Sequence, residues 1–292
     1  MDFGQTTVIR ELSFDVGRGE TFGFLGSNGS GKTTTLRALL GIYEPTAGVL
    51  EIDGRRFDPA DAGSLGYLPE ERGLYKKEPV LDVMVYFGQL KGMTAAAAKK
   101  WSLDYLERVD MGPQAKLRVD KCSGGQQQKV QLGVTIMNRP DLLILDEPTK
   151  GFDPVNRQLL MDIIFEQKTA GSTIVMVTHE MEQVERLCDR IVLLKDGTAR
   201  AYGSVTEVQE QFGGTTVQVT SAAPLPASDE YRVLSDDGAD HVELALAPGT
   251  DTAALLADWV RQGIAVSSFT PGRRSLNSIF VEVYGETAAG EA

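Results

Sequence analysis

Short, uniformly apolar runs alternate with segments of helical periodicity through much of the first 200 residues. The clearest apolar runs, typical of parallel strands covered on both faces, lie at 21–25, 142–145 and 173–177. Apolar residues spaced three and four positions apart predict helices at 33–40, 154–170 and 180–188. Strands that alternate with helices in this way predict an α/β domain built on a parallel sheet.

Period-two patterns predict a second kind of strand in the same region. Residues 3–25 are expected to form paired strands, because apolar and polar residues partly alternate at 8–16 and a turn follows at Gly17–Glu20. A strand at 49–54 is expected to end in the Asp53-Gly54 turn, and another short strand covers 65–70. The Asp196-Gly197 pair predicts a hairpin. These elements indicate an antiparallel β subdomain beside the parallel sheet.

The periodicity is helical from Pro79 to about Met111, and a further helix follows Ser123. This stretch predicts a helical insertion, the helical subdomain, over about 78–138. Beyond Phe212 the pattern changes to half-exposed strands at 215–220 and 242–246, a helix at 252–262 and a further candidate strand at 264–269. Residues 275–284 fit either a helix or a strand, and we favour the helix. We therefore expect two domains, 1–211 and a small α+β domain at 212–292, with a ferredoxin-like arrangement as one candidate for the second.

Charge and composition narrow the range of partners. The chain of 292 residues has a net charge of −12, and the segment from Val205 onward contains 4 Arg, no Lys and 13 Asp or Glu. Such an acidic chain is a poor non-specific nucleic-acid binder, so no nucleic-acid partner is expected. Two cysteines form no disulfide framework. No apolar run approaches the roughly 20 residues of a membrane span, and no secretion leader is expected.

The most informative motif is the loop between the first apolar run and the first helix. Gly26-Ser27-Asn28-Gly29-Ser30-Gly31-Lys32-Thr33 matches the phosphate-binding pattern G-x-x-x-x-G-K-[ST] at every fixed position, and Thr34 follows it. Glycines let successive N–H groups face one phosphate, and the helix dipole favours an anion there. Lys32 can reach the outer phosphates, and the Thr33 hydroxyl can ligate Mg²⁺. The alternative is a chance glycine-rich turn.

Three further positions have chemistry that suits a nucleotide site. Ser123-Gly124-Gly125-Gln126 begins a helix with two bare glycines, which suits an anion, although an ordinary capped helix has the same features. Asp146 ends an apolar strand and can hold Mg²⁺, while the adjacent Glu147 can polarise a water. His179 follows the next buried strand, where ligands bind in open α/β sheets, although a lone histidine is more often structural.

In this order the motifs resemble those of the nucleotide-binding subunit of ABC transporters, over about residues 1–210. The resemblance implies a P-loop ATPase that uses ATP and Mg²⁺. It assigns the signature motif to Cys122–Gln126, the second Mg²⁺ motif to Leu142–Asp146 and the catalytic glutamate to Glu147. It also places the D-loop at Gly151–Asp153, the switch histidine at His179, the Q-loop at Glu70 and an adenine-stacking aromatic at Phe3, with Glu70 a further candidate Mg²⁺ ligand.

The resemblance also implies partners and a location. Two head-to-tail copies would close on two ATP molecules, with Ser123, Gly124 and Gly125 of one copy capping the γ-phosphate held by the other. Separate transmembrane permease subunits would bind the pair at the cytoplasmic face of the cell membrane. The run Gly66–Tyr75 and the segment after 212 resemble a subgroup that serves ABC-2-type exporters. The alternatives are an importer ATPase with a C-terminal regulatory domain, a soluble non-transport ABC ATPase and a non-hydrolysing subunit.

Three positions depart from the family pattern. Cys122 and Phe152 stand where leucines are usual, and both keep the position apolar. Glu70 stands where the Q-loop glutamine is usual. A carboxylate there can still approach Mg²⁺ or take part in coupling.

Overall fold

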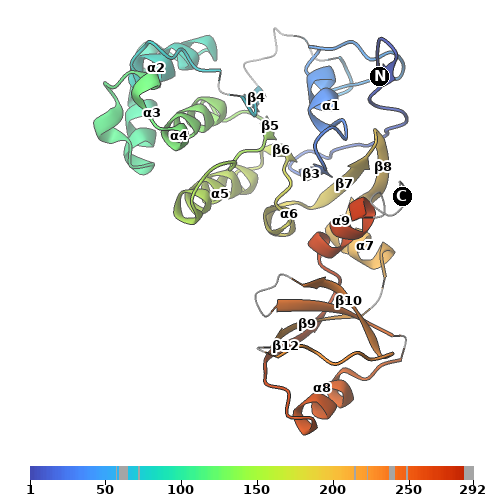
Figure 1. The fold of residues 1–292 in the computed structure, drawn as a ribbon. Coiled ribbons are helices and arrows are strands. Elements are labelled where there is room, and N and C mark those ends of the chain that lie inside the picture. Colours follow the sequence, from blue (N-terminus) through green and yellow to red (C-terminus); the bar gives the residue numbers. More distant parts are fainter. Residues whose placement is uncertain are drawn as a thin grey trace. The chain divides into compact units, whose positions relative to one another are not determined.

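The computed structural model describes residues 1–56, 58, 65–71, 73–213, 215–221, 223–236, 241–247 and 249–285 (Figure 1). Arg72 of the run 66–75 and Gly214 at the change of pattern lie outside these residues. The chain divides into two compact units, Met1–Tyr202 and Gly203–Ala292. The division at 211 and 212 and the helical subdomain at 78–138 stay predictions. None of the described helices has the length and apolarity needed to cross a bilayer.

A six-stranded sheet of order β4-β5-β6-β3-β7-β8 forms the centre of the first unit (Figure 1). Its strands are β3 Thr21–Gly26, β4 Leu65–Leu68, β5 Leu142–Asp146, β6 Thr173–Val177, β7 Arg190–Lys195 and β8 Thr198–Ser204. The neighbours from β4 to β7 pair in parallel, with Phe22 of β3 opposite Val175 of β6. The parallel sheet expected from the apolar runs is thus confirmed.

Burial on both faces of this sheet explains why its strands are uniformly apolar. One face packs against α1 Lys32–Leu39, where Leu36 and Leu40 meet Phe24 and Val177 in one core cluster. The alternate residues, such as Leu143 and Met176, are also fully buried. Two further helices follow sheet strands, α5 Pro154–Thr169 and α6 Met181–Leu187. Asp153 caps α5 and Pro154 occupies its first turn, as expected.

The N-terminal segment contains less sheet than its alternation predicts. Only β1 Asp2–Phe3 and β2 Thr6–Thr7 pair there, and Glu11 makes an isolated bridge to Thr198. The expected strand at 49–54 is reduced to a bridge between Ile52 and Arg55 around a tight turn. A strand forms only where a long enough partner is available, and a local pattern does not supply one. The predicted strand at 8–16 and the predicted strand at 49–54 were wrong.

Among the residues described between β4 and β5, three α-helices form the insertion, and they lie together in Figure 1. They are α2 Val80–Leu90, α3 Ala95–Arg108 and α4 Gly124–Ile136, with 3₁₀ turns η2 Gly112–Gln114 and η3 Val119–Lys121. Tyr105 of α3 lies against Gly133 of α4, and its hydroxyl donates to the Lys129 carbonyl at 2.7 Å. A Cβ at position 133 would lie 2.4 Å from the tyrosine ring, so glycine permits this close helix packing.

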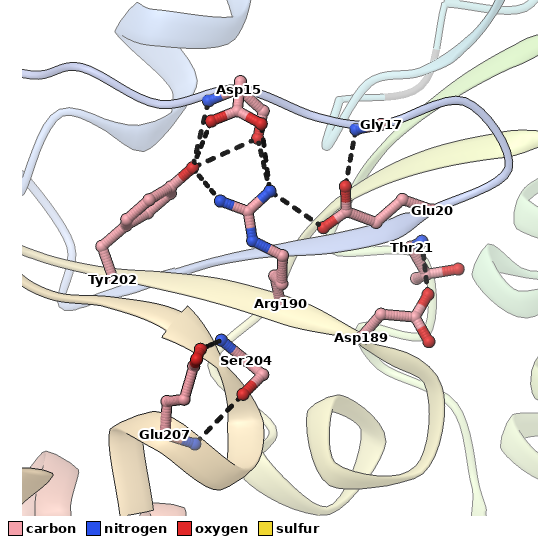
Figure 2. Close-up of polar contacts among 9 residues, drawn as sticks. All are labelled: Asp15, Gly17, Glu20, Thr21, Asp189, Arg190, Tyr202, Ser204 and Glu207. Carbon is pink, nitrogen blue, oxygen red and sulfur yellow. Dashed lines mark hydrogen bonds and ion pairs between the residues drawn. The ribbon is translucent and has the colours of Figure 1, made fainter.

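A polar cluster joins the N-terminal segment to β7 and β8 (Figure 2). Arg190 pairs with Asp15 at 3.1 Å and with Glu20 at 3.5 Å, and it also donates to the Tyr202 hydroxyl. Tyr202 in turn donates to Asp15 at 2.8 Å. The Arg190 guanidinium lowers the pKa of the Asp15 carboxyl. Residues 15–20 are therefore held at the start of the sheet although they form no strand.

The second unit contains a four-stranded antiparallel sheet of order β10-β11-β9-β12. Its elements are α7 Val205–Gln211, β9 Thr216–Ser221, β10 Tyr231–Asp236, β11 His241–Leu246, α8 Thr252–Arg261, β12 Val266–Gly272 and α9 Leu276–Gly285. Trp259 and Leu255 of α8 pack on Val217 and Val219 of β9. The expected α+β character is confirmed, but β10 and α7 were not predicted.

The order of strands in this sheet is the one expected for a ferredoxin-like fold. That fold has a helix in each of its two crossovers. Here α8 forms the second crossover, whereas residues 223–230 between β9 and β10 contain no helix. The unit is therefore a ferredoxin-like sheet with one crossover helix replaced by a loop.

Candidate nucleotide-binding site

The glycine-rich loop connects the end of β3 at Gly26 to the start of α1 at Lys32. Gly29 and Gly31 have φ values of 83° and 106°, a region that side chains with a Cβ rarely adopt. A Cβ at position 31 would also lie 2.2 Å from Ile9 Cδ1. The first N–H groups of α1 have no partner within the helix and point toward the loop. The sequence motif thus forms the strand, glycine loop and helix start that its pattern predicts.

Lys32 is buried within this loop, with 8% of its surface exposed. Its ammonium donates to the carbonyls of Gly26 at 2.7 Å and Ser27 at 2.8 Å. Burial lowers the pKa of Lys32, and the nearby carboxylates of Glu147, Asp146 and Glu70 oppose that shift. A lysine desolvated in this way gains most when an anion reaches it.

A cavity of about 800 Å³ lies in front of the loop and is lined by residues from five parts of the chain. The lining side chains and backbone belong to Val8, Asn28, Gly29, Gly31, Lys32, Thr33, Thr34, Glu70, Asp146, Glu147, Lys150, Val177 and His179. The cavity therefore brings together the loop, both acidic residues after β5 and the histidine after β6. It has the size of a nucleotide or drug-sized ligand pocket.

Asp146 and Glu147 face the cavity from the carboxyl end of β5. Asp146 is 1% exposed and accepts a 3.3 Å hydrogen bond from the Thr33 hydroxyl. Burial and the negative charge of Glu70 raise the pKa of Asp146 to about 6. A buried carboxylate beside a hydroxyl, with its charge poorly compensated, is suited to receive a divalent cation.

Glu147 and His179 form a hydrogen-bonded pair. His179 Nδ1 lies 2.8 Å from Glu147 Oε1, and the Glu147 side chain is 12% exposed. The Glu147 backbone has a φ of 51°, which is unusual for a residue with a side chain. Its N–H donates to the Val177 carbonyl at 2.8 Å, and this bond to β6 holds the strained conformation. Strain of this kind is found most often at functional sites.

Observations within the loop and cavity fit a nucleotide and Mg²⁺. The Ser30 hydroxyl in the loop is buried and has no hydrogen-bond partner within the described structure. Thr33 and Asp146 offer the hydroxyl and carboxylate oxygens that Mg²⁺ prefers. Among the described residues, no group of three or more His, Cys, Asp or Glu side chains could hold a metal alone. Mg²⁺ at few protein ligands is typical of sites where phosphate oxygens complete its shell.

Several predicted site residues do not line the cavity. Ser123 caps α4, and Gln126 completes a reciprocal capping box with it. Gly124 and Gly125 form the first turn of the same helix. The Asp153 carboxylate accepts from the N–H groups of Val155 and Asn156. Phe3 is 44% exposed and packs edge-on against Tyr43 at 5.3 Å. Within a single chain, these residues are separate from the loop.

Sequence reasoning missed Val8, Lys150 and Val177 among the cavity residues. The Lys150 ammonium lies 2.6 Å from Glu70 Oε1. The sequence contains a signal for Lys150, because this basic residue lies only four positions after Asp146, in the segment that the end of the strand carries to the loop. Val8 gave no signal, since its place depends on how the N-terminal segment folds back on the sheet.

A strand, a glycine loop and a helix start lie here with two acidic residues from the end of another strand of the same sheet, β5, and this combination defines a P-loop nucleotide-binding ATPase. Residues 9–150 match the ABC transporter family, and residues 203–284 match the C-terminal domain of DrrA1-3-like ATP-binding proteins. An uncharacterised ABC transporter ATP-binding protein of Methanocaldococcus jannaschii is 47% identical over 207 residues, covering 70% of this chain and 75% of that relative. The chain belongs to the family of ABC transporter ATP-binding proteins.

Two further comparisons agree with this assignment. Nod factor export ATP-binding protein I of Paraburkholderia xenovorans is 37% identical over 237 residues, covering 80% of this chain and 78% of that relative. The solved structure of an ATP-binding subunit of an ABC transporter has a TM-score of 0.66 and 29% identity, covering 72% of this chain and 89% of that chain. The protein is a nucleotide-binding, ATP-hydrolysing subunit with a P-loop core and an additional C-terminal domain.

Proposed function

We propose that the loop residues hold the phosphates of ATP. Gly26, Ser27, Asn28, Gly29, Ser30 and Gly31 form the cradle, and Lys32, Thr33 and Thr34 begin the helix that closes it. In this role Lys32 exchanges its contacts with the Gly26 and Ser27 carbonyls for the outer phosphates. The orphaned Ser30 hydroxyl in the loop supports the proposal. Phe3 would stack on the base from the exposed position it occupies beside Tyr43.

Asp146 and the Thr33 hydroxyl would hold Mg²⁺, with Glu70, which lines the same cavity, as a further ligand. When bound, Mg²⁺ neutralises charge on the outer phosphates. Asp146 supports this role because its surroundings provide too little positive charge for a carboxylate. Burial and the negative charges of Glu70 and Glu147 raise its pKa, and a bound cation would stabilise the ionised carboxylate against them.

Glu147 would accept a proton from, or polarise, the attacking water. Its hydrogen bond to His179 at 2.8 Å orients the carboxylate and brings the imidazole to the same side of the cavity. His179 would then contact the γ-phosphate and stabilise the charge that develops on it. The observation that carries the proposal is this convergence of Lys32, Asp146, Glu147 and His179 on one cavity.

A second copy of the chain would complete each site. Ser123, Gly124, Gly125 and Gln126 form a helix start with the properties of an anion site, yet they lie apart from the cavity of their own chain. Two chains related by a twofold axis can place each helix start over the other's loop. Asp153, exposed at the start of α5, would contribute near the same junction.

The dimer would drive separate permease subunits in the membrane, and the chain would lie at its cytoplasmic face. Export is the direction we favour, because the match of the C-terminal unit to DrrA1-3-like proteins is joined by a relative named for Nod factor export. An importer ATPase with a C-terminal regulatory domain is the other candidate. Co-purification with a membrane subunit from the native cell, followed by its identification, separates the two.

Glu147→Gln tests the shared site most directly. The exchange keeps the side-chain size and removes the general base, which costs about 10²–10⁴-fold in hydrolysis rate. Because Asp146 and Lys32 are unchanged, nucleotide binding survives and the closed dimer persists. Added ATP and Mg²⁺ should therefore shift the variant from monomer to dimer in size-exclusion chromatography, whereas wild type stays mostly monomeric.

The second variant, Glu147→Gln with Ser123→Arg, is the matched control. A bulky side chain at the α4 start blocks the cap over the partner's phosphate, so the shift to dimer should disappear while ATP binding remains. Hydrolysis by Glu147→Gln at the wild-type rate would place the base elsewhere. A variant that stalls as a monomer would refute the shared site.

A further inference from the structure

Lys150 and Glu70 form an ion pair at the nucleotide cavity, across 80 positions of sequence. The Lys150 ammonium donates to Glu70 Oε1 at 2.6 Å, and both residues line the cavity that contains Lys32 and Asp146. The two residues come from different parts of the fold, since Glu70 follows β4 and Lys150 follows β5. Adjacent parallel strands carry their following segments to the same sheet edge, which brings these charges together.

The pair lies within an electrostatically unbalanced site. Three carboxylates line the cavity, from Glu70, Asp146 and Glu147, against the ammonium groups of Lys32 and Lys150. Burial, and after it the negative charge of Glu70, raises the pKa of Asp146; burial lowers the pKa of Lys32, and Glu70 acts with Glu147 and Asp146 against that lowering. Without Lys150, the three carboxylates would face Lys32 alone, and a triphosphate would enter a cavity with two carboxylates that no cation compensates.

Stability of the fold does not explain the pair. The Lys150 and Glu70 side chains are 58% and 43% exposed, and exposed ion pairs contribute little to folding. Both residues line the cavity, so a nucleotide bound there would bring its several negative charges close enough for both side chains to act on them electrostatically. The consequence of the pair is therefore expected in ligand binding.

We propose that Lys150 is the counter-ion that makes a carboxylate at position 70 compatible with an anionic nucleotide. The proposal rests on the nucleotide site proposed above, and it makes Lys150 a positioning residue that holds Glu70 in a neutral pair at the cavity wall. The glutamate and the lysine thus function as a unit. An uncharged pair of the same shape should bind the nucleotide with the same affinity. Removing only one of the two charges should change that affinity.

Opposite effects of the two single substitutions distinguish this role from others. Lys150→Met keeps the side-chain length and leaves Glu70 unpaired, so nucleotide binding should weaken about fivefold. Glu70→Gln keeps the shape and leaves Lys150 unpaired, so binding should tighten by a similar factor. The double variant Glu70→Gln with Lys150→Met restores the charge balance and should bind within about twofold of wild type.

The measurement is equilibrium binding of methylanthraniloyl-ATP by fluorescence in EDTA, so that no metal contributes. Lys150→Arg is the conservative control and should bind like wild type. Raising the salt concentration to about 0.5 M should reduce the effects of both single substitutions, because screening shortens the reach of exposed charges. Circular dichroism and thermal unfolding should show all four variants folded as stably as wild type.

Three outcomes would overturn the proposal. Unchanged affinity in Lys150→Met means that the pair does not act on the nucleotide. A double variant as weak as Lys150→Met means that Lys150 binds a phosphate directly. Equal loss of affinity and of thermal stability means that Lys150 is structural. Lys32→Ala reports separately on the site itself: if that variant binds the probe like wild type, the nucleotide site is misassigned, whatever the Lys150 variants do.

Discussion

At the scale of single residues, the buried carboxyl of Asp146 lowers the stability of the fold when it is charged. Asp146 is 1% exposed, and its pKa is raised from 3.8 to about 6. A carboxyl whose pKa is raised on folding binds its proton more tightly in the folded state. The stabilisation that the protonated Asp146 carboxyl gives to the fold is therefore fully present below about pH 3.8, and it is lost as the pH rises through 6. At neutral pH, without a cation, the ionised Asp146 destabilises the fold.

Asp146→Asn should stabilise the nucleotide-free protein at neutral pH. The amide keeps an oxygen for the Thr33 hydroxyl and removes the buried charge, so the free energy of unfolding at pH 7.5 in EDTA should rise by about 1–3 kcal/mol. The increase should shrink between pH 6 and pH 4, because wild type is then protonated. Thermal unfolding at a series of pH values measures it.

The same substitution at an exposed carboxylate is the control for Asp146→Asn. Asp141 lies just before the other end of β5 and is exposed, so Asp141→Asn should change the unfolding midpoint little at any pH. If Asp146→Asn were less stable than wild type at pH 7.5 in EDTA, the carboxylate would be compensated better than its surroundings indicate.

At the level of elements, helix packing in the insertion depends on one close approach. Gly133→Ala would place a methyl group 2.4 Å from the Tyr105 ring. Alanine favours a helix over glycine by about 1 kcal/mol, but overpacking a buried contact costs about 1–3 kcal/mol. We therefore expect a net loss of about 1–2 kcal/mol in the free energy of unfolding, measured by urea denaturation.

Tyr105→Leu provides the double-mutant test of this contact. The smaller side chain removes the ring that the new methyl group meets, so adding Gly133→Ala to Tyr105→Leu should cost little. The double variant must then lose less free energy of unfolding than the sum of the two single losses, which shows that the two positions are coupled. Additive losses would indicate that the glycine is needed for its backbone and not for its lack of a side chain.

For the whole molecule, we propose that the P-loop domain binds nucleotide without the C-terminal one. The two compact units meet between Tyr202 and Gly203, and the cavity residues all lie in the first. A chain that ends at Phe212, the expected boundary, should keep its affinity for ATP within about twofold of full length. Isothermal titration with ATP and Mg²⁺, alongside circular dichroism, measures binding and folding together.

A second truncation locates the boundary more closely. Helix α7 belongs to the second compact unit and is bound within it, since Arg273 pairs with Glu210 and Arg274 donates to the Phe212 carbonyl. A chain ending at Ser204 removes α7 together with these partners, so it should unfold at no lower temperature than the chain ending at Phe212. A folded truncate that no longer binds ATP would show that the first unit does not bind alone.

Much of this architecture follows from local pattern. Uniform apolar runs identified β3, β5 and β6, because strands covered on both faces exclude polar residues. The glycine loop could be predicted for the same local reason: only glycine tolerates its backbone conformation, and the lysine must follow at fixed spacing. Asp146, Glu147 and His179 could be placed at one sheet edge because parallel strands end together there.

Only the tertiary structure decided which segments became partners. The alternation at 8–16 predicted a strand, yet that segment forms a single bridge to Thr198 and is held by contacts with Arg190 and Tyr202. Strand β10 was not predicted because its residues are mostly exposed or half-buried, and the segment forms a strand through its pairing with β11. The Lys150–Glu70 pair likewise depends on the register of β4 and β5. Pairing across long stretches of chain is a property of the assembled sheet, and a local pattern of hydrophobic and polar residues does not record it.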